Sequence, residues 1–142
     1  MRIPDEPVVD KVKQWLIHAD EDLRLAVHAM TLQTDEPPYR LIAYHAQQCA
    51  EKCLKAFLVC CGVDFPYTHN ISTLLELCSE YSDWTGKLQE AEQLTLYSIT
   101  TRYPGEAEEV TEAEASTAIE IARQVRDRVR AELKLLGMDL TE

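Results

Sequence analysis

One short segment of the sequence concentrates the residue types that could do chemistry. Residues 44–62 read YHAQQCAEKCLKAFLVCCG, with four cysteines, a histidine and a Glu-Lys pair. His45, Cys49 and Cys53 are four residues apart, so on a helix they would lie one turn apart, where imidazole and thiolate groups could bind zinc. The paired CxxC motifs typical of zinc sites are absent from the sequence, and we therefore favour packing over metal binding.

The cysteines of this segment share one side of a helical wheel with small and apolar residues. This arc, called the Ala/Cys face below, consists of Ala46, Cys49, Ala50, Cys53, Leu54, Ala56, Phe57, Cys60 and Cys61. A buried free cysteine behaves as a small hydrophobic residue, so the Ala/Cys face predicts close packing of neighbouring helices. A redox disulfide between Cys60 and Cys61 is disfavoured, because adjacent side chains on a helix point about 100° apart.

The opposite arc of the same wheel is polar. The polar face, as it is called below, consists of Tyr44, His45, Gln48, Glu51, Lys52 and Lys55. Glu51 and Lys55 have the spacing and order that favour an ion pair on a helix. Such a pattern is typical of a solvated helix face, and the alternative interpretation is a ligand-binding groove.

His69 lies in the segment FPYTHNISTLL, between Thr68 and Asn70. Both neighbours are residue types that cap helices, so a structural hydrogen bond at the start of the next helix is one interpretation of His69. The functional alternative is a contact from His69 to the polar face.

Arg102 and Tyr103 follow a predicted helix that ends at a Pro-Gly break, and Tyr97 precedes them on that helix. Arginine is suited to bidentate contact with a carboxylate or a phosphate. Arg102 could therefore form an ion pair with an acidic neighbour such as Glu51. The alternative is that Arg102 binds a nucleotide phosphate that enters between the second and fourth predicted helices, assisted by Lys52 or Lys55.

Helical periodicity accounts for most of the chain. The predicted helices extend from about Val9 to Thr31, Pro37 to Gly62, Ile71 to Cys78, Asp83 to Thr100, and Thr111 to Gly137. Pro37 and Pro38 suit a first helical turn, and Gly62 suits a helix end. Thr111 and Glu114 have the spacing of a capping box. The sequence therefore predicts one all-α domain over residues 1–142, a five-helix up-and-down bundle with a flexible N-terminus at 1–8 and a C-terminal tail at 137–142.

Composition limits the classes of function. The 142 residues carry a formal net charge of -11, which disfavours DNA or RNA binding and anionic membranes unless a local basic patch overrides it. No signal peptide and no apolar run of about 18 residues is evident, so we expect a cytoplasmic protein without a membrane segment. Five cysteines, an odd number, fit a reducing compartment.

Three segments together resemble the HEPN (higher eukaryotes and prokaryotes nucleotide-binding) domain family. They are QQCAEKCLKAFL, THNISTLL and LYSITTRYP, and they occur in order on the predicted helices. The resemblance covers nearly the whole chain and implies a small helical bundle. Many such proteins form two-component modules with a minimal nucleotidyltransferase. Others are metal-independent ribonucleases, and some have lost catalysis and bind ligands or partners.

The family resemblance implies a specific test for ribonuclease activity, because such members carry an arginine followed after four to six residues by a histidine. Arg102 is followed by YPGEAEEV, which contains no histidine. Arg40 and His45 match the spacing, but they lie at the start of the second predicted helix and their side chains would diverge by about 140° there, so we interpret the match as chance.

We therefore predict a non-catalytic HEPN binding and assembly module that pairs with a nucleotidyltransferase in a toxin-antitoxin-like system and holds a nucleotide. The alternative is a HEPN ribonuclease toxin. No catalytic residue, metal ligand or cofactor is predicted. The predicted ligand-binding residues are Gln48, Glu51, Lys52, Lys55, His69, Tyr97, Arg102 and Tyr103.

Several apolar residues fall outside the main apolar stripes of the predicted helices. They are Trp15, Leu41, Val59, Leu96 and Ile99. Because exposed apolar surface usually marks an interface, they predict a two-fold homodimer.

Overall fold

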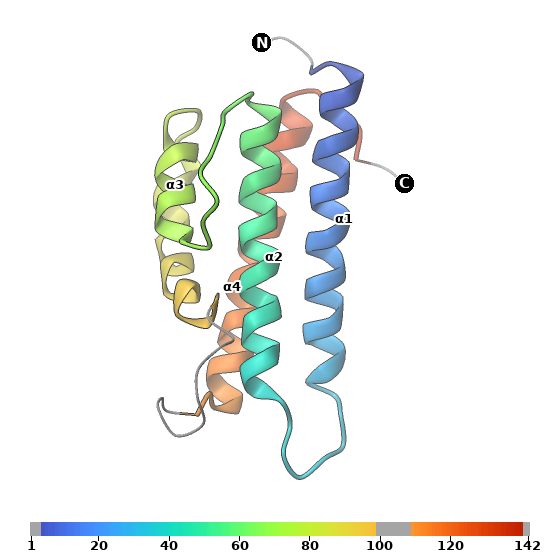
Figure 1. Cartoon of the computed structure of the whole chain (residues 1–142), viewed down its shortest axis with the longest axis vertical. Helices are drawn as coiled ribbons and strands as arrows, with labels where there is room; N and C mark the ends of the chain where they lie inside the picture. Colours follow the sequence, from blue (N-terminus) through green and yellow to red (C-terminus); the bar gives the residue numbers. More distant parts are fainter. Residues whose placement is uncertain (1–3, 99–108, 141–142) are drawn as a thin grey trace.

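The structure is a computed structural model that describes residues 4–98 and 109–140. Its elements are α1 (Glu6–Ala29), α2 (Tyr39–Cys60), α3 (Ile71–Ser79), η1 (Trp84–Ser98) and α4 (Glu112–Leu135). No strand occurs in these two ranges, and the predicted all-α five-helix bundle is confirmed. Helices α1, α2 and α4 extend along the long axis of the molecule, and α3 lies beside α2 (Figure 1).

The ends of the long helices follow from local backbone chemistry. Gly62 and Gly137 adopt φ angles of 72° and 93°, the left-handed conformation that ends a helix at little cost for glycine. The next residue then donates a hydrogen bond from its backbone N–H to the carbonyl five residues earlier, at 2.9 Å for Val63 and 3.0 Å for Met138. Both helices therefore end in a Schellman motif at the predicted glycines.

Two helix starts also agree with the sequence. The Thr111 hydroxyl accepts a hydrogen bond from the Glu114 backbone N–H at 3.1 Å, and the Glu114 carboxylate accepts one from the Thr111 backbone N–H at 3.1 Å. This is the predicted capping box. Asn70 caps α3 by accepting a hydrogen bond from the Thr73 N–H at 3.2 Å.

Other boundaries differ from the prediction. Helix α1 begins at Glu6 rather than Val9, because Pro7 suits a first helical turn, so part of the expected flexible N-terminus is helical. Helix α2 begins at Tyr39, one residue after the proline pair. At the other end of the chain, Met138 and Leu140 of the expected tail are buried against the core.

Of the five helices, the fourth differs most from its prediction. η1 is wound as a 3₁₀ helix, and its backbone departs from helical angles at Leu88 (φ -110°, ψ 17°). Leu88, Ala91 and Leu94 are all buried, and their spacing of three matches the three-residue period of a 3₁₀ helix rather than an α-helix. The predicted end of this helix at Thr100 lies outside the described residues.

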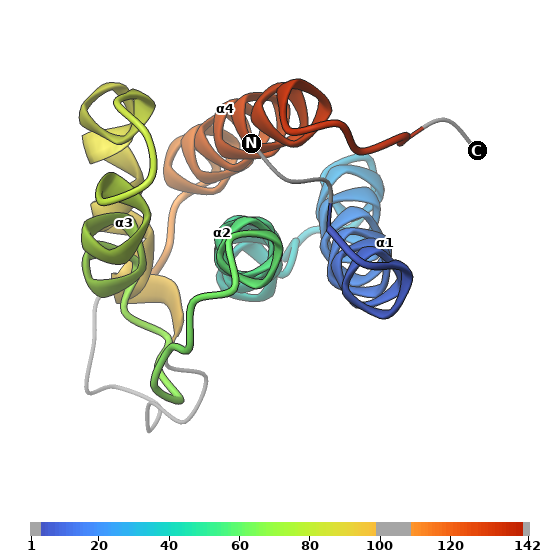
Figure 2. The ribbon, with the colours of Figure 1, turned by 90° about the horizontal axis from the view of Figure 1, so that it is seen from above.

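Helix α2 lies at the centre of the bundle and contacts the other four elements (Figure 2). Its Ala/Cys face explains this position, because small side chains allow neighbouring helix backbones to approach. Six small residues of α2 are fully buried, namely Ala43, Ala46, Cys49, Ala50, Cys53 and Ala56. Larger side chains fill the space on the η1 side, where Phe57 packs edge-on against Trp84 with 5.0 Å between the ring centroids.

The cysteines are consistent with packing. Cys49 and Cys53 are buried as predicted, whereas Cys60 and Cys61, near the end of α2, are only half-buried. A hydrogen bond with Cys53 and burial raise the pKa of the Cys49 thiol well above its usual range. Burial raises the pKa of Cys61 to about 11, so these thiols remain protonated at neutral pH. Within residues 4–98 and 109–140 no three His, Cys, Asp or Glu side chains are grouped to hold a metal ion.

None of the helices in the described ranges has the length and hydrophobicity needed to span a lipid bilayer.

The packing of Cys53 gives a first prediction. Cys53→Ala should lower the free energy of unfolding by less than about 1.5 kcal/mol, because it removes little volume. Cys53→Leu should lower it by about 1–3 kcal/mol, because the fully buried site has no room for a larger side chain. Urea denaturation of both variants measures the difference. Equal stability of the two variants would contradict close packing at this position.

Candidate functional site

The polar face of α2 is largely covered rather than solvated. Gln48 is 8% exposed, Glu51 3% and Lys55 5%, so the interpretation as a solvated helix face is wrong for these three residues. Tyr44, His45 and Lys52 are half-buried. Sequence periodicity alone did not reveal the cover, which consists of side chains from α1 and from the segment 62–70 between α2 and α3.

Glu51 is the most highly coordinated residue of this face. Its Oε1 accepts a hydrogen bond from Gln47 Nε2 at 3.0 Å and lies 2.8 Å from His69 Nδ1. Its Oε2 lies 3.0 Å from Lys55 Nζ. An ionised carboxylate can only accept hydrogen bonds, so Nδ1 of His69 carries the proton in this contact and Nε2 is an acceptor in the neutral ring.

Two glutamines extend this network. Gln47 also donates to the backbone carbonyl of His69 at 3.2 Å, and Gln48 Nε2 donates to Gln47 Oε1 at 2.8 Å. Gln47 is fully buried and was not among the predicted site residues. Its only sequence signal is its position beside the polar face, four residues before Glu51.

Aromatic rings surround the buried ammonium group of Lys55. Its Nζ lies 5.7 Å from the ring centroids of Trp15 and Phe65, and 5.9 Å from that of Tyr67. These distances are within the range of cation–π attraction. Trp15 comes from α1, and the other two rings come from the segment 62–70, so this one lysine holds three parts of the chain together.

A second polar cluster joins α2 to α1. Asp22 Oδ1 lies 2.9 Å from His45 Nδ1, and Asp22 Oδ2 lies 2.6 Å from Lys52 Nζ. Asp22 was not predicted as a site residue. The sequence indicates it only by position, because Asp22 directly precedes Leu23 of the apolar stripe of α1. A charged side chain that is buried beside such a stripe requires a partner.

The structure thus joins four of the eight predicted ligand-binding residues in one network, namely Gln48, Glu51, Lys55 and His69. Lys52 belongs to the second cluster, where it pairs with Asp22. The expected contact of His69 with the polar face is present. Arg102 and Tyr103 lie outside the described residues, as does the proposed pair between Arg102 and Glu51.

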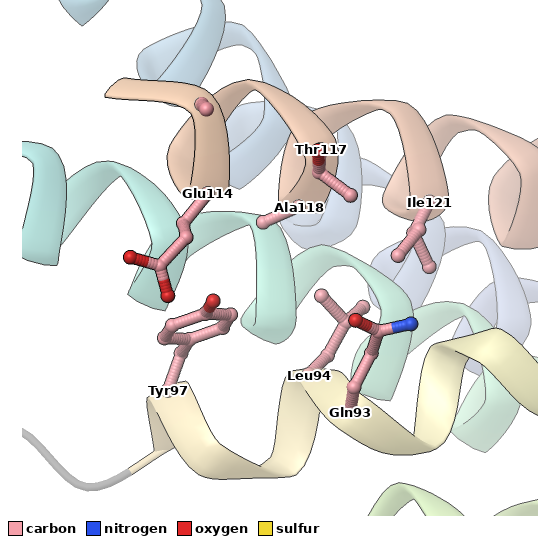
Figure 3. Close-up of a pocket in the computed structure, with 8 residues that line it drawn as sticks. Gln93, Leu94, Tyr97, Glu114, Thr117, Ala118 and Ile121 are labelled. Carbon is pink, nitrogen blue, oxygen red and sulfur yellow. The ribbon is translucent and has the colours of Figure 1, made fainter. Parts of the chain in front are cut away.

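Tyr97 lies elsewhere, between η1 and α4. Its side chain points toward Glu114 at an open pocket of about 280 Å³ (Figure 3). Burial raises the pKa of the Tyr97 phenol, and the charge of Glu114 and a hydrogen bond with it raise this pKa further. Tyr97 therefore does not belong to the same site as the polar face.

The formal charges of the polar face balance once Asp22 of α1 is included. Asp22 and Glu51 carry two negative charges, and Lys52 and Lys55 carry two positive ones. The groups with remaining exposure lie at the edge, where the side chain of His69 is 44% exposed and Tyr67 is 92% exposed. The arrangement can therefore present an aromatic ring and imidazole acceptors to a ligand while the interior of the cluster stays paired.

The buried ion pair gives a second prediction. Lys55→Met should lower the free energy of unfolding by about 3–5 kcal/mol, because Glu51 would keep a buried carboxylate without its ammonium partner. Lys52→Met is the matched control and should cost about 1 kcal/mol, since that side chain is 23% exposed. Chemical denaturation measures both. If the Lys55→Met variant is as stable as the control, the pair does not stabilise the fold.

Comparisons with known proteins agree with this architecture. The family model for the HEPN domain matches residues 12–132. The crystal structure of TT1696 from Thermus thermophilus superposes with a TM-score of 0.73 at 30% identity, covering 85% of this chain and 97% of that one. The structure of ST0689, an archaeal HEPN homologue, gives a TM-score of 0.67 at 26% identity and covers 85% and 96%. The comparison with curated proteins gave no match. The chain belongs to the HEPN domain family.

Proposed function

We propose that this HEPN domain is a non-catalytic binding and assembly module. In this proposal it forms a homodimer, pairs with a minimal nucleotidyltransferase in a toxin-antitoxin-like system, and holds a nucleotide on the polar face of α2. The observation that carries the proposal is the buried network around Glu51, which fixes exposed aromatic and imidazole groups at its edge.

The edge of the polar face offers the two kinds of contact that a nucleotide requires. Tyr67 is 92% exposed and lies edge-on to His69 with 5.5 Å between the ring centroids, which supports stacking with a base. Lys52 is 23% exposed at the same face, whereas Lys55 is covered. The Lys52 ammonium group has three donors, so it can bind a phosphate while it keeps its contact with Asp22.

The role of Arg102 in this proposal is argued from the sequence alone. It lies near the end of the segment LYSITTRYP and is the arginine that we expect to contact a phosphate, with Tyr103 beside it. If Arg102 binds the ligand, Arg102→Ala should melt like the wild type and lose the stabilisation by nucleotide. If Arg102 is structural, the variant should melt at a lower temperature.

Nucleotide binding is testable by thermal shift with the four ribonucleoside triphosphates. A ligand present at about 100 times its Kd should stabilise the folded protein by about 2.7 kcal/mol. Tyr67→Ala and Lys52→Met should fold and lose most of this stabilisation. Tyr81→Ala is the control, because Tyr81 is also an exposed tyrosine, 49% exposed, but lies after α3. No shift with any of the four nucleotides, or an equal loss in the control, would contradict the proposal.

The dimer is a separate prediction. Leu41 and Leu96 are 41% and 56% exposed, which supports an interface, whereas Trp15 and Val59 pack against the core and no longer support it. Ile99 lies outside the described residues. Static light scattering at micromolar concentration should give twice the mass of the 142-residue chain. A monomer mass would remove this part of the proposal.

The alternative function is a ribonuclease, and one observation favours it. Asp22 holds Nδ1 of His45, which leaves Nε2 as a proton acceptor suited to general base catalysis. The absence of a histidine after Arg102 and the net charge of -11 favour the binding module. Cleavage of single-stranded RNA that is lost in His45→Ala or Arg102→Ala would reverse this order.

A further inference from the structure

The pocket between η1 and α4 is independent of the polar face of α2. It is open to solvent and has a volume of about 280 Å³, below the range of about 300–1,000 Å³ typical of sites for drug-sized ligands. Its lining combines apolar groups with polar ones (Figure 3). Leu94, Ala118 and Ile121, which are 0%, 1% and 4% exposed, form the apolar part of the lining, and Gln93, Tyr97 and Glu114 form the polar part.

Glu114 is the charged residue of the pocket. Of the described residues that line it, no other carries a formal charge, and within the described ranges no lysine or arginine forms an ion pair with Glu114. Its Oε1 accepts the Thr111 N–H of the capping box at 3.1 Å. A carboxylate has about four lone-pair positions, so it retains capacity for a further donor beside the Thr111 N–H.

The chemistry of the lining selects one class of ligand. An anion would be repelled by Glu114 and by the acidic surface of a chain with net charge -11. A planar guanidinium or an ammonium group matches a carboxylate, and a short hydrocarbon chain matches the apolar lining. We infer that the pocket between η1 and α4 binds a small organic cation, with Glu114 as its anionic partner.

Isothermal titration calorimetry with butylguanidinium and the uncharged butylurea tests the inference, because the two probes have nearly the same shape. Butylguanidinium should bind the wild type at least about tenfold more tightly than butylurea, a difference of about 1.4 kcal/mol. Glu114→Gln should abolish this preference. The variant should still fold, because glutamine also serves as the third residue of a capping box.

The matched control is Glu120→Gln, which removes one negative charge from an exposed position of the same helix outside the pocket. It should leave the affinity for butylguanidinium within about twofold of the wild type. A second variant, Thr117→Leu, leaves the capping box intact and should weaken binding by partly filling the pocket. It keeps the inference testable if Glu114→Gln fails to fold.

Three results would overturn the inference. They are no binding of butylguanidinium to the wild type, equal affinity for both probes, and an equal loss in Glu114→Gln and Glu120→Gln. The last would indicate general attraction by the acidic surface rather than a site. Lys52→Met should leave the binding of butylguanidinium unchanged, which separates this site from the proposed nucleotide site.

Discussion

The burial of one carboxylate constrains much of this structure. Glu51 is 3% exposed, and a buried ionised carboxylate is strongly destabilising unless it is paired and hydrogen-bonded. Lys55 supplies the opposite charge from the next turn of α2, and Gln47 supplies a hydrogen bond from the previous turn. His69 must then return from the segment 62–70 to complete the set. The path of that segment, and with it the position of α3, therefore depends on the requirements of Glu51.

Helix α2 can hold Glu51 in this way because its two sides make different kinds of contact. The small side chains of the Ala/Cys face allow α1 and α4 to pack closely against α2, and they have little volume and few conformations to lose. The polar face forms directed contacts to α1 and to the segment 62–70. A central helix that was apolar all round would leave the connecting segment without a defined place.

The sequence predicted those features that depend on neighbouring residues. Gly62, Gly137 and the Thr111 capping box mark helix ends through local backbone chemistry, and all three are where the pattern indicated. The burial of Glu51 could not be predicted this way, because Trp15 and Phe65, which help to cover the adjacent Lys55, come from distant parts of the chain. The contacts of Asp22 could not be predicted for the same reason, because its partners His45 and Lys52 lie on another helix. A helical wheel describes one helix, whereas burial depends on what packs against it.

The contacts of Asp22 have a consequence for how α1 and α2 align. A face of small residues such as the Ala/Cys face is nearly smooth, so two helices packed through such surfaces could slide past one another by one turn, about 5.4 Å, with a small change in buried area. Asp22 meets His45 and Lys52, which lie seven residues, or two turns, apart along α2. A shift of one turn in either direction would move the Asp22 carboxylate away from either His45 or Lys52. The residue left behind would then have lost its partner. This polar contact would therefore fix the register of the two helices, a role for which directional and charged groups are better suited than apolar packing.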